Sequence, residues 1–174
     1  MPPTHVLIVE DFALFRQFIR STLGKRCDLQ ILGEVSDGLE AVQKAVQLKP
    51  DLILMDIGLP SLNGIEAARR IRKLVPESKI IFLSQESSAD VVQGAFDVGA
   101  WAYVVKERAG SELLAAVDAA ISGERFVSSA EAQSGHLSRH LSVSGFVLAG
   151  AAPKRNSRKP PARPPSAAPT RRNN

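Results

Sequence analysis

The chain has 174 residues, 44% of them hydrophobic and 23% charged, which allows one globular domain with a sizeable core and an appendage. Its single cysteine, Cys27, excludes an internal disulfide, and no apolar run approaches the roughly 20 residues of a membrane-spanning helix. The first residues lack the basic and apolar segments of a signal peptide, so we expect a cytoplasmic protein without membrane attachment.

The net charge of +4 is distributed unevenly along the chain. Residues 153–174 contain seven Lys and Arg residues and no acidic residue. Residues 1–152 therefore hold the other 15 of the 22 basic residues against all 18 acidic residues, a net charge of −3. The high isoelectric point thus comes from the C-terminal segment alone.

Apolar runs alternate with helical patterns from residue 5 to about residue 122. The runs predict strands at 5–10, 29–35, 52–56, 79–84 and 101–106. Apolar residues at helical spacing predict helices at 14–23, 38–48, 65–75 and 89–98, and a fifth helix with Ser111 as its N-cap. Five strand–helix units with such apolar strands predict an α/β fold, with a parallel sheet covered by helices on both faces.

The periodic pattern ends after Gly123. We expect a folded domain over residues 1–125, a linker over 126–152 and a disordered tail over 153–174, which contains six prolines beside its seven cations. The apolar stretch GFVLAGAA, residues 145–152, is too short to cross a bilayer and reads either as a docking turn or as loose chain.

Polar residues stand where four of the predicted strands end. In parallel α/β sheets ligands bind beyond the carboxyl ends of the strands. Clustered carboxylates repel one another unless a cation intervenes, and Mg²⁺ suits a site with few oxygen ligands. A hydroxyl and an ammonium would serve the oxygens of a phosphoryl group, for which an aspartate is a known nucleophile. The set predicts metal-assisted phosphorylation of Asp56 and consists of Glu10, Asp11, Asp56, Ser84 and Lys106.

Four segments, VLIVED, LILMDIGLPSLNGIEAARRIR, IIFLS and AYVVK, closely resemble the receiver domains of two-component response regulators. The details are most similar to the NarL/FixJ subfamily, in which a Glu-Leu-Leu helix follows the lysine after the fifth strand, as at 112–114 here. The resemblance covers about residues 4–125. It implies a flavodoxin-like (βα)5 fold with strand order 2-1-3-4-5.

The resemblance also implies a magnesium site and a phospho-acceptor. Glu10 and Asp11 match the acidic pair that holds Mg²⁺ directly or through water. Asp56 matches the phospho-acceptor, which is also a metal ligand, and the backbone carbonyl of Gly58 completes the protein's share of the ligands. The phosphoryl group would come from a sensor histidine kinase or a phosphotransfer protein.

Three further positions match the switch of the family. Ser84 resembles the switch hydroxyl, Lys106 the cation that binds the phosphoryl group, and Tyr103 the aromatic side chain that swings inward when Ser84 moves. The resemblance implies an output through protein contacts, by a homodimer or a partner on the surface of the fourth helix, fifth strand and fifth helix. It implies a switch with at most slow autophosphatase activity, not an enzyme.

An enzyme alternative is a phosphatase of the haloacid-dehalogenase type, which also uses an aspartate after a parallel strand. That family expects a second aspartate two residues after the nucleophile, and Gly58 occupies that position here. We therefore reject this alternative.

The sequence departs from the family next to the switch hydroxyl. Residue 85 is usually small in the family and is Gln85 here, so we expect it to narrow access to the phosphoryl pocket or to slow loss of the phosphate. Gly58 and Glu86 flank the path of hydrolytic water and are expected to tune autodephosphorylation.

The segment after residue 123 also differs from the NarL/FixJ pattern. It lacks the apolar periodicity of a helix-turn-helix domain, so we expect no sequence-specific DNA binding, and only non-specific contact with nucleic acid through the tail. The alternative is a remnant of a DNA-binding transcriptional regulator whose basic tail still contacts nucleic acid. His136 and His140 share helical spacing but have no further ligands nearby in the sequence, so we do not expect them to bind a metal.

Overall fold

The computed structural model describes residues 2–128 and 146–148. The strands of its single sheet are β1 (Thr4–Val9), β2 (Leu29–Val35), β3 (Leu52–Asp56), β4 (Lys79–Ser84), β5 (Ala102–Val105), β6 (Arg125–Val127) and β7 (Phe146–Leu148). The helices are α1 (Ala13–Leu23), α2 (Gly38–Leu48), α3 (Gly64–Leu74), α4 (Ala89–Asp97) and α5 (Ala109–Ile121), and a 3₁₀ turn covers Lys106–Arg108. None of the described helices is both long and apolar enough to cross a membrane.

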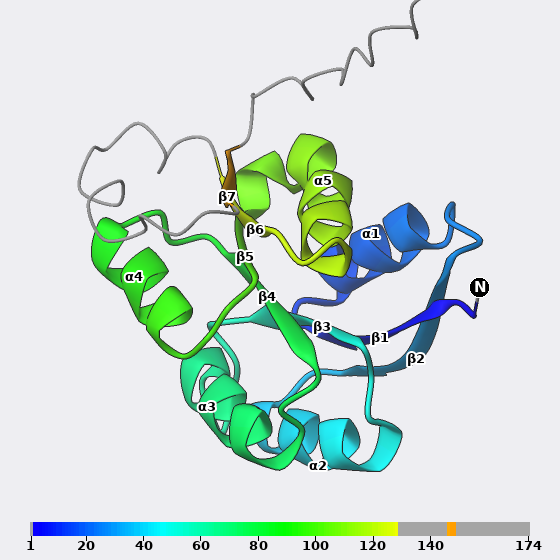
Figure 1. Cartoon of the computed structure of the whole chain (residues 1–174). Coiled ribbons are helices and arrows are strands. Elements are labelled where there is room, and N and C mark those ends of the chain that lie inside the picture. The colour runs from blue at the N-terminus through cyan, green and yellow to red at the C-terminus, as the bar shows by residue number, and fades with distance from the viewer. Residues whose placement is uncertain (1, 129–145, 149–174) are drawn as a thin grey trace, which may run out of the picture.

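All strands of the sheet run parallel, in the order β2-β1-β3-β4-β5-β6-β7 (Figure 1). Helices α1 and α5 cover one face of the sheet, and α2, α3 and α4 cover the other (Figure 1). The parallel α/β fold and the order 2-1-3-4-5 of the first five strands are confirmed. The sheet is longer than the five strands predicted, because β6 and β7 extend it beyond β5.

The sheet separates two hydrophobic cores, one on each face. Successive side chains of a strand point alternately into one core and the other, as the period of two in a strand requires. Val9 and Met55 belong to the core under α2, α3 and α4, whereas Ile8 and Leu54 belong to the core under α1 and α5. Every residue of β3 is buried, so its near-continuous apolar sequence reflects a central strand with helices on both faces.

The start of α5 differs from the prediction. Ser111 was expected to be the N-cap, but the helix begins at Ala109, directly after the 3₁₀ turn. The Ser111 hydroxyl donates to the carbonyl oxygen of Arg108 at 3.1 Å, as a side chain inside a first helical turn does. The prediction is wrong because the helix already includes residue 111, whereas a cap residue has an extended backbone and precedes the helix.

The end of the described fold is also more ordered than the sequence pattern indicated. Strand β6 pairs with β5, and β7 uses Phe146–Leu148, part of the stretch read as a docking turn or loose chain. The rest of that stretch, the two histidines and the basic tail lie outside the described residues.

Candidate functional site

The carboxyl ends of β1, β3, β4 and β5 meet at one edge of the sheet, as the parallel topology requires. A pocket of about 440 Å³ lies at this edge. Of the predicted residues, Glu10 and Tyr103 are fully buried and do not line the pocket. The others do, and the lining includes Asp11, Asp56, Gly58, Ser84, Gln85 and Lys106.

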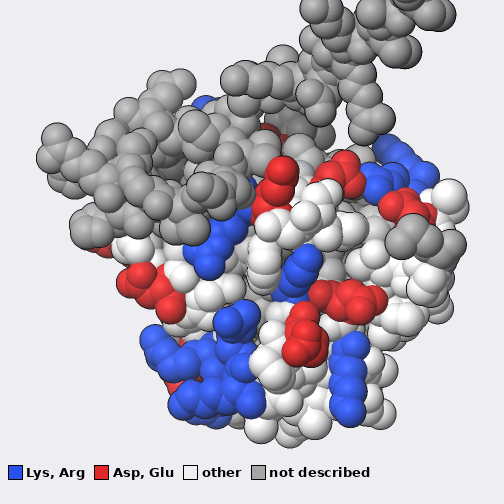
Figure 2. Space-filling view, in the orientation of Figure 1, with Lys and Arg blue, Asp and Glu red and all other residues white. Residues whose placement is uncertain are grey.

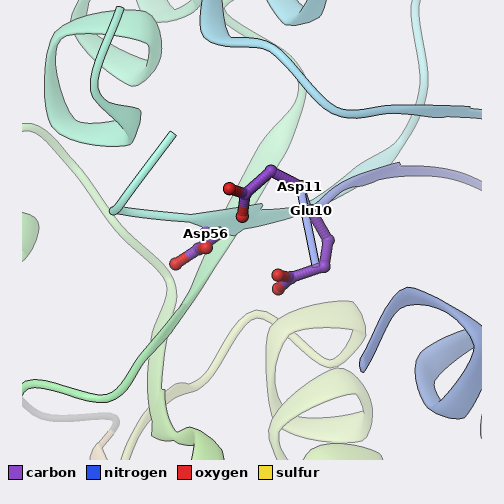
Figure 3. A group of neighbouring side chains, drawn as sticks. All are labelled: Glu10, Asp11 and Asp56. Carbon is purple, nitrogen blue, oxygen red and sulfur yellow. The ribbon is translucent and has the colours of Figure 1, made fainter. Parts of the chain in front are cut away.

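Three carboxylates lie close together at this edge of the sheet. Figure 3 shows Glu10 and Asp11, which follow β1, turned toward Asp56 at the end of β3. Each offers an oxygen, and these three atoms lie within 4.8 Å of one another. Glu10 is fully buried and Asp56 is 6% exposed, whereas Asp11 is exposed. The site therefore has a deep acidic floor and one acidic group at its rim.

Lys106 brings positive charge to this cluster. Its Nζ lies 2.8 Å from Glu10 Oε2 and 2.9 Å from Asp56 Oδ2. Burial alone would lower the pKa of the Lys106 ammonium, but its bonds to the two carboxylates outweigh burial and raise that pKa above its ordinary value. Lys106 is thus held in its charged form between the two acids.

Glu10 is the most deeply buried carboxylate of the cluster. Burial raises its pKa, and the nearby Asp56 charge raises it further, against the opposing effects of Lys106 and of the Phe12 N–H. Its Oε2 atom is buried and makes no hydrogen bond among the described residues, although the Lys106 charge is close. One ammonium among three carboxylates leaves an excess of negative charge. These residues fit a hard divalent cation such as Mg²⁺.

Hydrogen bonds join the two predicted switch residues, Ser84 and Tyr103, to the loop that follows β4. The Ser84 hydroxyl oxygen accepts from the Glu86 N–H at 3.1 Å, which leaves the hydroxyl hydrogen able to donate into the pocket. The Tyr103 hydroxyl donates to the carbonyl oxygen of the same residue, Glu86, at 2.8 Å. Tyr103 is fully buried, so the ring points inward and is tied to the loop that follows Ser84.

The loop after β3 is shaped by two glycines. Gly58 donates its N–H to Asp56 Oδ1 at 3.2 Å, and Gly64 starts α3 against the backbone of β3. A Cβ at Gly64 would lie 2.0 Å from the Asp56 carbonyl oxygen, so only glycine allows this close approach.

The structure adds aromatic residues that the sequence did not single out for the site. Phe15, predicted only as part of the apolar face of its helix, places its ring 4.9 Å from Lys106 Nζ. Phe12 is 59% exposed and lines the pocket. An exposed aromatic directly after the acidic pair was a signal in the sequence, but the Phe15 contact depends on how α1 lies over β5.

A parallel sheet with paired acids after β1, an aspartate after β3 and a lysine after β5 is the arrangement of a receiver-type fold. The chain matches the family of the response regulator receiver domain over residues 6–118 and belongs to that family. Receiver domains serve two-component signalling as switches rather than as classical enzymes, and they interact with kinases or phosphotransfer proteins.

Curated relatives agree with this assignment. The transcriptional regulatory protein PdtaR of Mycobacterium tuberculosis (strain ATCC 25618 / H37Rv) is 38% identical over 147 residues, which cover 83% of this chain and 70% of PdtaR. The transcriptional regulatory protein LiaR of Bacillus subtilis (strain 168) is 36% identical over 119 residues, which cover 68% of this chain and 56% of LiaR. The resemblance to NarL-type regulators is thereby confirmed.

Solved structures share the fold. A two-component response regulator of the LuxR family from Aurantimonas sp. SI85-9A1 superposes with a TM-score of 0.73 at 29% identity, covering 79% of this chain and 99% of that one. The response regulator domain of Thermotoga maritima CheB gives a TM-score of 0.64 at 34% identity, covering 69% and 97% of the two chains.

Proposed function

We propose that the protein is a phosphorylation-controlled switch with Asp56 as the phospho-acceptor and a histidine kinase or phosphotransfer protein as the donor. The position of the Asp56 carboxylate supports this most directly. Its Oδ2 lies 2.9 Å from Lys106 Nζ, with Glu10 and Asp11 beside it and an open pocket in front. The carboxylate oxygen attacks phosphorus, the phosphorus–nitrogen bond to the donor histidine breaks, and its electron pair returns to the imidazole.

The surrounding residues hold the charges of the transferred group. Glu10, Asp11, Asp56 and the Gly58 carbonyl would hold Mg²⁺, which neutralises negative charge on the phosphoryl oxygens when bound. Lys106 exchanges its contact with Asp56 Oδ2 for a contact with a phosphoryl oxygen. Ser84 donates its hydroxyl hydrogen to a second phosphoryl oxygen.

The hydrogen bond from Tyr103 to Glu86 offers a route from the site to the surface. Movement of Ser84 and Glu86 toward the phosphoryl group shifts the loop before α4 and, through Tyr103, the surface formed by α4, β5 and α5. The output is a protein contact on that surface, by a homodimer or a partner, inside the cytoplasm. The division into a receiver domain over 1–125, a linker over 126–152 and a tail over 153–174 stays a prediction.

Incubation with acetyl phosphate and Mg²⁺ tests the proposal, with intact mass as the readout. We expect the wild type to gain the mass of one phosphoryl group and Asp56→Asn to gain none. EDTA should abolish the gain, because the phosphoryl charges then lack a divalent cation. A wild type that stays unmodified, or an Asp56→Asn variant that is modified equally, would rule out Asp56 as the acceptor.

A second candidate function is a remnant of a DNA-binding regulator. Seven cations without an acidic residue in 153–174 favour contact with phosphates, and both PdtaR and LiaR carry the name of transcriptional regulatory proteins.

A further inference from the structure

Arg16, on the second turn of α1, reaches back to the backbone that carries the acidic pair. Its Nη1 donates to the Glu10 carbonyl oxygen at 2.5 Å and lies 3.5 Å from the Asp11 carbonyl oxygen. One guanidinium thus spans the two peptide groups from which the side chains of Glu10 and Asp11 project. No part of the function described so far uses this contact.

The acidic loop, residues 10–12, has few other hydrogen bonds that hold it in place. Phe12 is the N-cap of α1 but makes no side-chain cap bond, and the first turn contains no acidic residue. The Phe12 N–H is instead satisfied by Glu10 Oε1 at 3.1 Å. The same carboxylate must also meet Lys106 and offer an oxygen to a metal. The Glu10 N–H also donates to the Val35 carbonyl oxygen at 3.0 Å, so β2 anchors the start of the loop. The support that the Glu10 carboxylate gives to Phe12 would be lost whenever that carboxylate moved.

Arg16 is itself anchored on the neighbouring edge strand. Its Nε lies 3.6 Å from Glu34 Oε2 on β2, and the side chains of Arg16 and Glu34 are about equally exposed, at 25% and 27%. Arg20, one turn further along α1, pairs with the other oxygen of Glu34 at 3.6 Å. No described contact joins Arg20 to the acidic loop, so the two arginines share an anchor but only Arg16 reaches the site.

We infer that Arg16 is a positioning residue that holds Glu10 and Asp11 in the geometry a divalent cation requires. The inference rests on the metal site proposed above. A cation with strict coordination geometry needs its ligands fixed to within a fraction of an ångström, and residues that orient such ligands are part of the site without touching the ion. Arg16 contacts no reacting atom. It fixes the two peptide planes from behind, and its positive charge offsets some of the carboxylate repulsion.

Mg²⁺ affinity, measured by isothermal titration calorimetry, tests this role with a matched control on the same helix. We expect Arg16→Met to bind Mg²⁺ about tenfold more weakly than the wild type, the usual lower range for loss of a ligand-orienting residue. Arg20→Met removes the same kind of side chain and a bond to the same Glu34, and should leave the dissociation constant unchanged. Arg16→Lys keeps the positive charge but loses the branched guanidinium group. Its Mg²⁺ affinity should lie between those of Arg16→Met and the wild type.

Amide hydrogen exchange without metal provides the second readout. Exchange at Asp11 and Phe12 should be faster in Arg16→Met than in the wild type, and unchanged in Arg20→Met. Equal exchange in Arg16→Met and the wild type would overturn the inference, as would equal loss of Mg²⁺ affinity in the two methionine variants. If the wild type itself bound no Mg²⁺, the metal-site proposal would fail, whereas the exchange comparison would still decide whether Arg16 orders the loop.

Discussion

Lys106 pairs with two carboxylates at once, and this shared contact bears on how the site would respond to the proposed phosphorylation. Its ammonium lies at nearly equal distances from Glu10 and Asp56. In the proposed acyl phosphate, Asp56 would lose its carboxylate charge and the phosphoryl oxygens would take its place. The Phe15 ring and Glu10 retain the lysine near its position, so the ammonium needs to redirect its bonds rather than travel.

Gln85 is predicted to narrow access to the phosphoryl pocket. Its side chain is exposed and lines the pocket next to Ser84. We expect Gln85→Ala to be phosphorylated faster by acetyl phosphate, because the shorter side chain opens the approach to Asp56. Ser87→Ala is the control, since Ser87 belongs to the same loop but not to the pocket lining. Rates followed by intact mass would contradict this role if Gln85→Ala and Ser87→Ala matched the wild type.

At the scale of elements, α3 and α4 are both preceded by a residue type suited to an N-cap. Only the residue before α3 makes a side-chain hydrogen bond to the helix backbone. The Asn63 side chain accepts the Glu66 N–H at 2.9 Å at the start of α3. Ser88 occupies the same place before α4 and makes no side-chain cap bond. This cap bond fixes the start of α3, which lies beside Asp56 because Gly64 approaches the backbone of β3 closely.

This difference predicts unequal costs for two similar substitutions. Asn63→Ala should destabilise the protein by about 1 kcal/mol, the usual value of an N-cap bond. Ser88→Ala should leave the melting temperature unchanged, because no bond is lost. Thermal unfolding by circular dichroism measures both variants. Equal shifts would mean that Ser88 caps α4 in solution, or that the Asn63 bond contributes nothing.

Most of these elements are predictable because their signals are local. The continuous apolar run of β3 and the helical spacing of α1–α4 are visible in a short window of sequence. The start of α5 and the pairing of β6 are not, because they depend on a distant contact. Ser128 is fully buried, and its hydroxyl accepts from the Val105 N–H at 2.9 Å while donating to Glu112. In the sequence, this serine cannot be told from any other serine that follows a short apolar run.

The residues of the candidate site also divide into those that the sequence predicts and those that it does not. Glu10, Asp56, Ser84 and Lys106 were predictable because every parallel strand brings its end to the same edge, so position along the chain is enough. The face on which each side chain lies also follows from the strand period, which separates Asp56 from the side of Ser84 and Tyr103. Arg16 was not predictable, since its role depends on the path of a long side chain across a turn.

At the scale of the whole molecule, the charge is divided between an acidic body and a basic tail, but the body has a basic patch of its own. Figure 2 shows Lys and Arg side chains gathered over α3, and the basic residues of that helix are Arg69, Arg70, Arg72 and Lys73. Glu66 pairs with Arg69 and Arg70, which reduces the positive charge that this patch offers to a partner. Two separate regions could therefore attract a polyanion, and they need to be distinguished.

Removal of residues 153–174 distinguishes them. The remaining chain has a net charge of −3, so we expect the truncated protein to lose affinity for duplex DNA of unrelated sequences. Full-length protein should bind such DNA weakly, with a salt slope no steeper than about −6, the value that seven phosphate contacts allow. Fluorescence anisotropy over a salt series measures both proteins. The double variant Arg72→Glu, Lys73→Glu in the full chain is the control for the α3 patch and should bind like the wild type.

The outcomes separate the two output functions. DNA binding that disappears with the tail and ignores sequence fits a switch whose output is protein contact, because such binding cannot select a promoter. DNA binding that survives truncation and falls in the α3 double variant would transfer the contact to the receiver domain itself. Preference for one DNA sequence, retained at physiological salt, would instead favour the remnant of a transcriptional regulator, since base contacts rather than counterion release would then carry the affinity.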